Sequence, residues 1–259
     1  MKLTDTHTHL YLDAFDTDRQ AVVERAIEQG VTSMLLPNID SGSLDALVAL
    51  CDQFPGHCFP MLGLHPTSVV ADYKTELEKL FSRFEEQAFV AIGEIGIDLY
   101  WDKTFFTQQQ SAFRSQIEFA LEKGLPVVIH SRDSFNAIMS ILIDYKNSGL
   151  RGVFHCFTGT IEEAQQAVDL GFKLGIGGVL TFKNSGLDKV VREIDLKHLL
   201  LETDSPFLAP VPFRGKRNES TYINLIANKL SEIKQVTKEE VALATTQNAI
   251  DLFNLTEHE

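Results

Sequence analysis

Leu3-Thr4-Asp5-Thr6-His7-Thr8-His9-Leu10 is the stretch from which the rest of the chain can be understood. Residues two apart on a strand point to the same side, so a strand here presents His7 and His9 next to each other. Two neighbouring imidazoles suit one divalent metal ion. The alternative is that two histidines in a threonine-rich strand form only a tolerated polar edge. Polar residues further along the chain decide between the two.

Short apolar segments alternate with longer amphipathic ones along the whole chain. After the first strand, further strands are predicted at 31–37, 59–65, 89–96, 125–130, 152–157, 172–178 and 198–204. Helices are predicted at about 21–27, 43–54, 76–86, 106–123, 134–145, 161–170, 219–233 and 241–253. Gly30, Gly124 and Gly171 each end a helix. Thr160 with Glu163, and Thr237 with Glu240, have the spacing of a capping box at a helix start.

This alternation predicts an α/β protein with a single (β/α)8 TIM barrel over residues 1–259. The chain has a normal length for one such barrel. A doubly wound open sheet is the alternative, but the Gly-x-Gly-x-x-Gly turn expected after its first strand is absent. No linker, low-complexity run or short repeat divides the chain.

The composition is that of an ordinary globular protein, with 44% hydrophobic and 23% charged residues. The chain shows no apolar leader and no run long enough to span a membrane, so we expect a cytoplasmic protein that acts as a monomer without a membrane partner. Its cysteines are odd in number and lack the Cys-x-x-Cys spacing, which argues against a disulfide framework and a thiolate zinc site. They are Cys51, Cys58 and Cys156.

The formal charge is 23 − 36 = −13. Such a charge argues against a protein that coats duplex DNA through a broad basic face. It does not exclude a nuclease, because bound divalent ions and one local basic loop can serve a short stretch of backbone.

Polar side chains interrupt the ends of the predicted strands, and in a TIM barrel functional residues gather at the C-terminal strand ends. Each has an ordinary alternative role: a turn cap, a satisfied core histidine, an ion pair or a helix start. Their joint placement instead predicts one site on the barrel rim. The residues are His7, His9, His65, Glu94, His130, His155 and Asp204.

Four of these five imidazoles and the two carboxylates already exceed the needs of one tetrahedral ion, which predicts two divalent metal ions bridged by a carboxylate. Glu94, on a middle strand, is the natural bridge. Nitrogen and oxygen ligands together suit Zn or Mn, and Mg with retained waters is a further possibility.

The successive motifs resemble those of the TatD family of metal-dependent deoxyribonucleases, in order and in spacing, from about Leu3 to Leu255. The wider amidohydrolase group usually carries a lysine on the fourth strand, where this chain has Glu94. The motifs are His7-Thr8-His9, Gly63-Leu64-His65-Pro66, Gly93-Glu94-Ile95-Gly96-Ile97-Asp98, His130-Ser131-Arg132, His155-Cys156-Phe157-Thr158-Gly159 and Glu202-Thr203-Asp204-Ser205-Pro206.

The resemblance implies a role for each rim residue. His7, His9 and Asp204 would hold one metal, His130 and His155 the other, with Glu94 as the bridge and His65 beside the scissile phosphate. The implied activity is hydrolysis of DNA phosphodiesters by a metal-activated water. The acidic charge favours an exonuclease acting on strand ends or single strands. We expect catalytic roles for Asp204, Glu94 and His65, and Glu202 supports the site or forms a plain salt bridge.

Substrate contacts are predicted on the loop after the eighth strand, where many barrels bind phosphate. Arg214, Lys216 and Arg217 form the tight basic cluster of this loop, and Lys183 is a further candidate. A solvated turn is the alternative. The family motif usually continues Asn-Glu-Pro, whereas this chain has Asn218-Glu219-Ser220.

Aromatic residues are also predicted at the rim, where a ring can stack on an unpaired base or simply pack. They are Tyr100, Trp101, Phe157, Phe182 and Phe207, with Trp101 as the candidate for stacking.

Two other functions remain open from the sequence. The same metals could serve an ester or amide hydrolase, such as an aminoacyl-tRNA deacylase or a small-molecule amidohydrolase, because one barrel hosts many chemistries. A non-catalytic metal-binding scaffold is the other, although a scaffold has no need for six ligands around an open rim.

Overall fold

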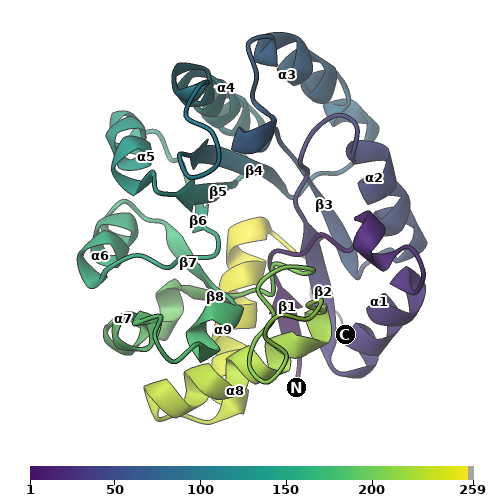
Figure 1. The fold of residues 1–259 in the computed structure, drawn as a ribbon, viewed down its shortest axis with the longest axis vertical. Helices are drawn as coiled ribbons and strands as arrows, with labels where there is room; N and C mark the ends of the chain where they lie inside the picture. The colour runs from purple at the N-terminus through teal and green to yellow at the C-terminus, as the bar shows by residue number, and fades with distance from the viewer. Residues whose placement is uncertain (256–259) are drawn as a thin grey trace.

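Eight parallel strands form a barrel in the order in which they occur in the chain (Figure 1). The computed structural model describes residues 1–255. Thr6 N donates to Leu201 O (3.1 Å) and Asp204 N to His7 O (2.9 Å), which joins the last strand to the first. The predicted TIM barrel is therefore confirmed. Its strands are β1 (Leu3–Asp5), β2 (Val31–Leu36), β3 (Cys58–Leu62), β4 (Ala91–Asp98), β5 (Val127–Arg132), β6 (Gly152–Phe154), β7 (Lys173–Ile176) and β8 (Leu199–Leu201).

Helices surround the strands, and local sequence signals mark the ends of several of them. Gly30, Gly124 and Gly171 have positive φ values of 87°, 68° and 88° directly after helices. Both predicted capping boxes form. The helices are α1 (Arg19–Glu28), α2 (Leu44–Gln53), α3 (Tyr73–Ser82), α4 (Phe106–Lys123), α5 (Phe135–Leu142), α6 (Ile161–Asp169), α7 (Leu187–Glu193), α8 (Ile223–Lys234) and α9 (Lys238–Phe253).

Several predicted boundaries were wrong at the rim of the barrel. β1, β6 and β8 end before the polar residues that were placed on them, because the chain turns there into the site. Cys156 and Asp204 have φ values of +46° and +57°, which extended strands do not adopt. Helix α3 starts about one turn earlier than predicted, and α7 forms where no residues had been assigned to a helix.

Helix α9 does not join the outer ring but lies across the N-terminal end of the barrel (Figure 1, yellow). Its Asn248 side chain donates to the carbonyls of Leu196 and Leu199, at the start of β8. Apolar residues near its end pack against inward-facing strand residues, so this helix closes the barrel interior. The buried cluster comprises Leu35, Met61, Ala91, Val128, Val153, Leu200, Ala249, Leu252, Phe253 and Leu255.

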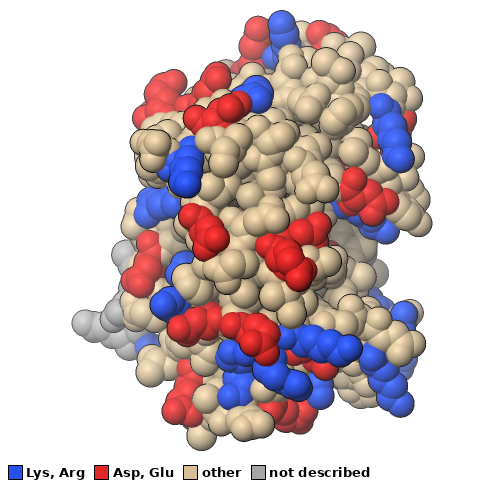
Figure 2. All heavy atoms as spheres, turned by 90° about the vertical axis from the view of Figure 1, so that its left-hand side faces the viewer, with Lys and Arg blue, Asp and Glu red and all other residues tan. Residues whose placement is uncertain are grey.

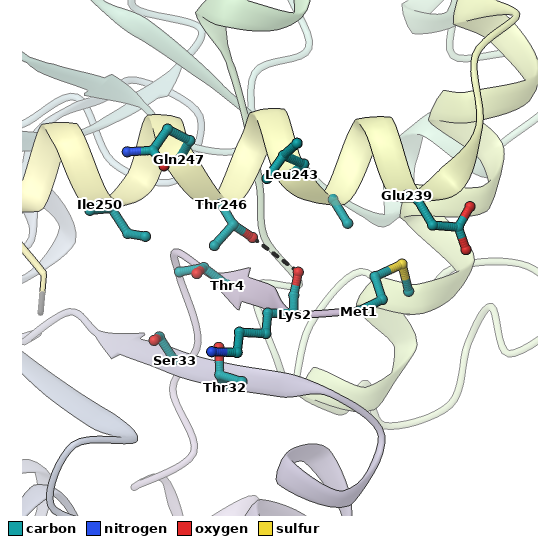
Figure 3. A pocket seen from close by; sticks show the side chains of 11 residues that line it. Met1, Lys2, Thr4, Thr32, Ser33, Glu239, Leu243, Thr246, Gln247 and Ile250 are labelled. Carbon is teal, nitrogen blue, oxygen red and sulfur yellow. Dashed lines mark hydrogen bonds between the residues drawn. The ribbon is translucent and has the colours of Figure 1, made fainter. Parts of the chain in front are cut away.

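A cavity of about 400 Å³ lies at this end, between one face of α9 and the first residues of β1 and β2 (Figure 3). Leu243, Thr246 and Ile250 of α9 line one side, and Thr4 and Thr32 line the other. The Thr246 hydroxyl donates to the Lys2 carbonyl across it (3.3 Å). The cavity is therefore partly bridged by the contact that attaches α9 to β1.

Acidic and basic side chains are mixed over the face shown in Figure 2, with lysine and arginine gathered in its lower part. This face does not present the broad basic surface that a protein needs to bind along duplex DNA. None of the described helices is long and apolar enough to cross a membrane. The prediction of one domain over 1–259 stays a prediction, and its last four residues, 256–259, lie outside the described residues.

Candidate metal centre

The two histidines of the first motif lie side by side just beyond β1. The segment continues between β2 and β8, with Thr8 N donating to Leu35 O (3.1 Å) and His9 N to Ser205 O (2.7 Å). Extended backbone therefore persists past the end of the strand, and the Nε2 atoms of His7 and His9 are 3.2 Å apart.

Glu94, on β4, lies at the centre of the cluster. Its Oε2 faces His7 Nε2 at 3.2 Å and His9 Nε2 at 3.7 Å. Its Oε1 faces the other group, at 3.3 Å from His65 Nε2, 2.7 Å from His130 Nδ1 and 2.8 Å from His155 Nε2. One carboxylate thus separates two sets of imidazoles, with one oxygen directed at each.

Asp204 completes the first set from the neighbouring chain segment, which follows β8. Its Oδ1 lies 3.8 Å from His7 Nε2 and 3.6 Å from His9 Nε2. Its left-handed backbone turns the chain after β8 and brings this carboxylate over the rim.

The hydrogen bonds of His9 show which of its nitrogens can bind a metal. The Tyr11 hydroxyl donates its proton to Pro37 O (2.7 Å), so it must accept from His9 Nδ1 at 3.1 Å. Burial lowers the pKa of His9 well below its usual value, which keeps the ring neutral. His9 Nε2 therefore turns a lone pair toward two carboxylates, an arrangement that a cation between them would stabilise.

The spacing of the donor atoms also fits divalent metals. Three groups have ligand atoms within 4.8 Å of one another: His7 with His155 and Asp204, His7 with His9 and Glu94, and His65 with Glu94 and His130. Donors about 2.0–2.2 Å from one ion lie roughly 3–3.5 Å apart, close to the separations around Glu94. His65 belongs to one of these groups, so its nitrogen is also within reach of a metal held there.

Burial and the neighbouring titratable groups shift the pKa values of the residues in the cluster. Burial, with smaller effects of Glu94 and Glu202, raises the pKa of Asp204 to about 8. Burial lowers the pKa of His7 to about 4. Burial also opposes the ionised form of Glu94, but the surrounding imidazoles outweigh it and hold the pKa of Glu94 well below its usual value.

Asp98 holds His130 from behind, a contact that was not predicted from the sequence. Its Oδ2 lies 2.9 Å from His130 Nε2, while the other ring nitrogen faces Glu94. Burial opposes the charged ring, but the hydrogen bonds to Asp98 and Glu94 raise the pKa of His130. The signal was available, because Asp98 follows Glu94 by four residues on one strand and shares its face.

Glu202 supports His155. One of its carboxylate oxygens accepts from Cys156 N and lies 3.5 Å from His155 Nδ1. Metal-binding histidines commonly place their second nitrogen against such a carboxylate, which fixes the ring. The contact is with the site and not with an arginine, as a plain salt bridge would require.

Asp5 joins β1 to the segment after β8 from below and was also missed. It accepts hydrogen bonds from Thr203 N (2.9 Å) and the Thr203 hydroxyl (2.6 Å). Burial raises the pKa of Asp5 to about 7. Because Thr203 precedes Asp204, this contact fixes the position at which that carboxylate enters the site. Its sequence signal was an acidic residue inside a predicted barrel strand, two residues before His7.

The predicted substrate cations do not all lie free. The Arg214 guanidinium lies 4.4 Å from the centre of the Phe182 ring. Both residues, with Lys183, line a cavity of about 490 Å³ between the β7–α7 and β8–α8 loops. Lys216 is exposed on the same β8–α8 loop.

Arg217 is placed differently from what a phosphate contact needs. Its two terminal nitrogens bind both oxygens of Asp18 at 2.7 Å, and one also donates to Ala14 O (2.9 Å). A guanidinium satisfied in this way closes a loop contact, so we leave Arg217 out of the proposed substrate contacts.

The rim aromatics separate into buried and exposed rings. Phe157 is buried and packs in the core. Phe207 is exposed, with its ring 6.0 Å from that of His9. Tyr100 and Trp101, on the loop after β4, are 54% and 69% exposed. The exposed rings are the ones available to a substrate.

The sequence model described as TatD related DNase matches residues 4–254. The chain belongs to the TatD family. Among its relatives is the uncharacterized metal-dependent hydrolase YabD of Bacillus subtilis, which is 38% identical over 254 residues, covering 98% of this chain and 99% of the relative. The 3′-5′ ssDNA/RNA exonuclease TatD of Pantoea vagans is 33% identical over 258 residues, covering 97% and 99%.

Solved TatD structures agree with the fold. The crystal structure of YjjV, a TatD homologue from Escherichia coli K12, superposes with a TM-score of 0.92 at 31% identity, covering 98% of both chains. This TatD protein is accordingly a metal-dependent hydrolase. The candidate ligands lie where such an enzyme needs them, at the C-terminal rim of the barrel.

Proposed function

We propose that this TatD protein is a two-metal phosphodiesterase that removes nucleotides from the ends of single-stranded DNA. The observation that carries the proposal is the position of Glu94, with one oxygen toward His7 and His9 and the other toward the remaining three histidines. A carboxylate between two ligand sets is the arrangement of a two-metal hydrolase.

His7, His9 and Asp204 would hold one metal, His130 and His155 the other, and Glu94 would bridge them. When bound, such metals supply Lewis acidity, which makes water a nucleophile at neutral pH and withdraws charge from a phosphoryl oxygen. Zn, Mn and Mg all suit this mixed donor set.

Asp204 is the group that we assign to accept a proton from the attacking water. Its carboxyl lies at the rim, with Oδ1 3.8 Å from His7 Nε2 and 3.6 Å from His9 Nε2, where it can face a water held at the first metal. His65 Nδ1 lies 2.6 Å from the Thr67 hydroxyl, which leaves Nε2 directed into the cluster beside the scissile phosphate. Both residues would act on the reacting atoms.

The nucleic-acid part of the proposal rests on cations of the loops after β7 and β8, at the same end of the barrel as the candidate ligands, and on the named activity of one relative. Arg214 and Lys183 line one cavity, and Lys216 is exposed nearby. These cations suit a few phosphates, while the charge of −13 opposes long duplex contacts. The Pantoea vagans relative is named as an ssDNA/RNA exonuclease.

Steady-state kinetics of Arg214→Ala combined with Lys183→Ala tests this proposal. We expect the KM for a single-stranded oligonucleotide to rise about tenfold, with the salt dependence of binding reduced by about 0.7 per charge removed. Lys229→Ala, at a partly exposed lysine of α8 paired with Glu232, is the matched control. An unchanged KM and salt dependence, or turnover of carboxylic esters without any cleavage of oligonucleotides, would contradict the proposal.

A further inference from the structure

An arginine and two aromatic rings form an exposed cluster between the ends of β4 and β5. The Arg132 guanidinium carbon lies 4.0 Å from the centre of the Tyr100 ring and 5.5 Å from that of Trp101. The two rings meet edge to face, with centres 4.9 Å apart. We call these three residues the rim platform.

Packing does not account for the rim platform. Both rings are more exposed than buried, and neither belongs to the apolar core. No carboxylate in the described part of the chain forms an ion pair with Arg132, which is itself exposed. Exposed rings beside an unpaired guanidinium are the groups that stack on bases and bind phosphates in single-strand recognition.

The platform is fixed relative to the metal centre through Asp98. One oxygen of this carboxylate accepts from the backbone nitrogens of Tyr100 (2.9 Å) and Trp101 (3.1 Å). The other oxygen contacts the ring of His130. The buried Asp98 side chain therefore contacts both the loop that carries the two aromatic rings and His130, a candidate metal ligand.

Arg132 is fixed in the same way from β5. It follows His130 by two residues, and its carbonyl accepts from Leu99 N (2.9 Å). The same strand therefore carries the guanidinium of the rim platform and a candidate metal ligand.

We infer that Tyr100, Trp101 and Arg132 form one nucleotide subsite, in which a base stacks on the exposed indole and the guanidinium binds the phosphate of that nucleotide. The inference rests on the proposed function. It adds to that function the three residues that would hold the terminal nucleotide of the strand beside the metals. Planar guanidinium groups suit phosphate because two N–H groups can donate in parallel. Stacking tolerates every base, so this subsite would not select sequence.

Tryptophan fluorescence measures this subsite directly, because Trp101 is the one tryptophan among the 259 residues. The metal-loaded protein is titrated with thymidine monophosphate and with a short oligothymidylate whose phosphorothioate linkages resist cleavage. We expect saturable quenching by both ligands. Arg132→Gln should raise the dissociation constant about tenfold, whereas Arg114→Gln, on the outer face of α4 beside Asp144, should leave it unchanged.

Kinetics supply a second measurement. We expect Trp101→Ala to raise the KM for oligonucleotides about tenfold, within the range expected for one lost base stack, with a smaller change in kcat. An abasic residue at the bound end should raise the KM of the wild-type protein and have little effect on Trp101→Ala. A mere structural role of Trp101 would not produce this dependence on the base.

The outcomes separate the subsite from the proposed function. Cleavage of oligonucleotides without quenching, or with an unchanged KM in Trp101→Ala, overturns the subsite and leaves the phosphodiesterase proposal standing. Quenching that depends on Arg132, in a protein that cleaves no oligonucleotide, supports the subsite and refutes the nuclease. Neither quenching nor cleavage overturns both.

Discussion

The two ends of the barrel differ in what their side chains do. At the N-terminal end, Leu35, Met61 and Leu200 point inward and pack under the last turns of α9. At the C-terminal end, the same set of strands delivers His7, Glu94 and other buried polar groups to an open rim. The comparison indicates that the N-terminal end of the barrel contributes mainly to stability, while the C-terminal end carries the candidate catalytic groups.

Backbone geometry differs in kind between the rim and the helix ends. After strands of the functional rim, Asp133, Cys156, Asp204 and Leu208 have positive φ although they are not glycines, whereas Gln235 and Asn254, which also have positive φ, are the C-cap residues of α8 and α9. Such conformations are unfavourable for most residues and persist where the surroundings hold them. The contacts of Asp5 and Glu202 with the neighbouring backbone supply that support.

Removal of the proposed bridging carboxylate tests most strongly whether the rim affects activity without affecting stability. In Glu94→Ala we expect kcat to fall about a thousandfold or more, since metal-derived stabilisation of the transition state amounts to several kcal/mol. The melting temperature should change little, because α9 and the apolar end hold the fold. Hydrolysis assays and thermal melts check both parts, with exposed Glu24→Gln as the control. Near-normal turnover in Glu94→Ala would refute its bridging role.

The converse change is made at the apolar end. Phe253 is 2% exposed beneath the barrel, so Phe253→Ala should cost about 3–5 kcal/mol of unfolding free energy. The kcat per folded molecule should stay the same. Urea unfolding and active-site titration test this, with Leu243→Ala as the control, since Leu243 is on the same helix but 73% exposed. A loss of kcat in folded Phe253→Ala would show that the two ends are not independent.

A smaller effect is expected from the support behind His155. Glu202→Gln keeps the shape of the side chain but removes its charge, so metal affinity or kcat should fall about 10–100-fold. Metal titration of stripped protein gives the affinity. Equal affinity and equal kcat in the variant would mean that Glu202 acts only as a backbone acceptor for Cys156.

The smallest effect is expected at the loop contact between Asp18 and Arg217. Hydrogen bonding to Arg217 lowers the pKa of Asp18 below its ordinary 3.8. The ion pair therefore stabilises the fold above that pH, and its contribution disappears as the pH falls through the lower folded value. For this half-exposed pair we expect Asp18→Asn to cost at most about 1 kcal/mol at pH 7.

Urea unfolding of Asp18→Asn and of the wild-type protein at pH 7 and pH 3.5 gives the difference. In a separate variant, Arg217→Gln, the KM for oligonucleotides should be unchanged, because Arg217 is engaged by Asp18 in the wild-type protein and does not contact phosphate. A tenfold rise in KM would return Arg217 to the substrate site.

Much of the fold was predictable because its signals are local. The positive-φ glycines after helices and the two capping boxes depend on a few adjacent residues, and α4 begins and ends at the predicted Phe106 and Lys123. The strands at the rim were predicted too long, because apolar character does not show where a chain leaves the ladder. His155 and Asp204 lie just past those ends.

The meeting of the candidate metal ligands was predictable for a different reason. Parallel strands of a barrel bring their C-terminal ends together, so polar residues at those ends share one rim. The orientation of Asp98 toward His130 and the pairing of Arg217 with Asp18, 199 residues away, depend on how loops approach in space. No local pattern encodes such an approach, which is why the sequence suggested a phosphate contact for Arg217.

The most direct test of the two-metal mechanism is hydrolysis of end-labelled single-stranded DNA by metal-stripped protein, with Mg, Mn or Zn restored one at a time. The mechanism predicts no cleavage by the stripped protein, and stepwise shortening from one end once a metal is restored and about two equivalents are bound. No shortening with any of the three metals, by protein shown to bind two equivalents, would contradict it.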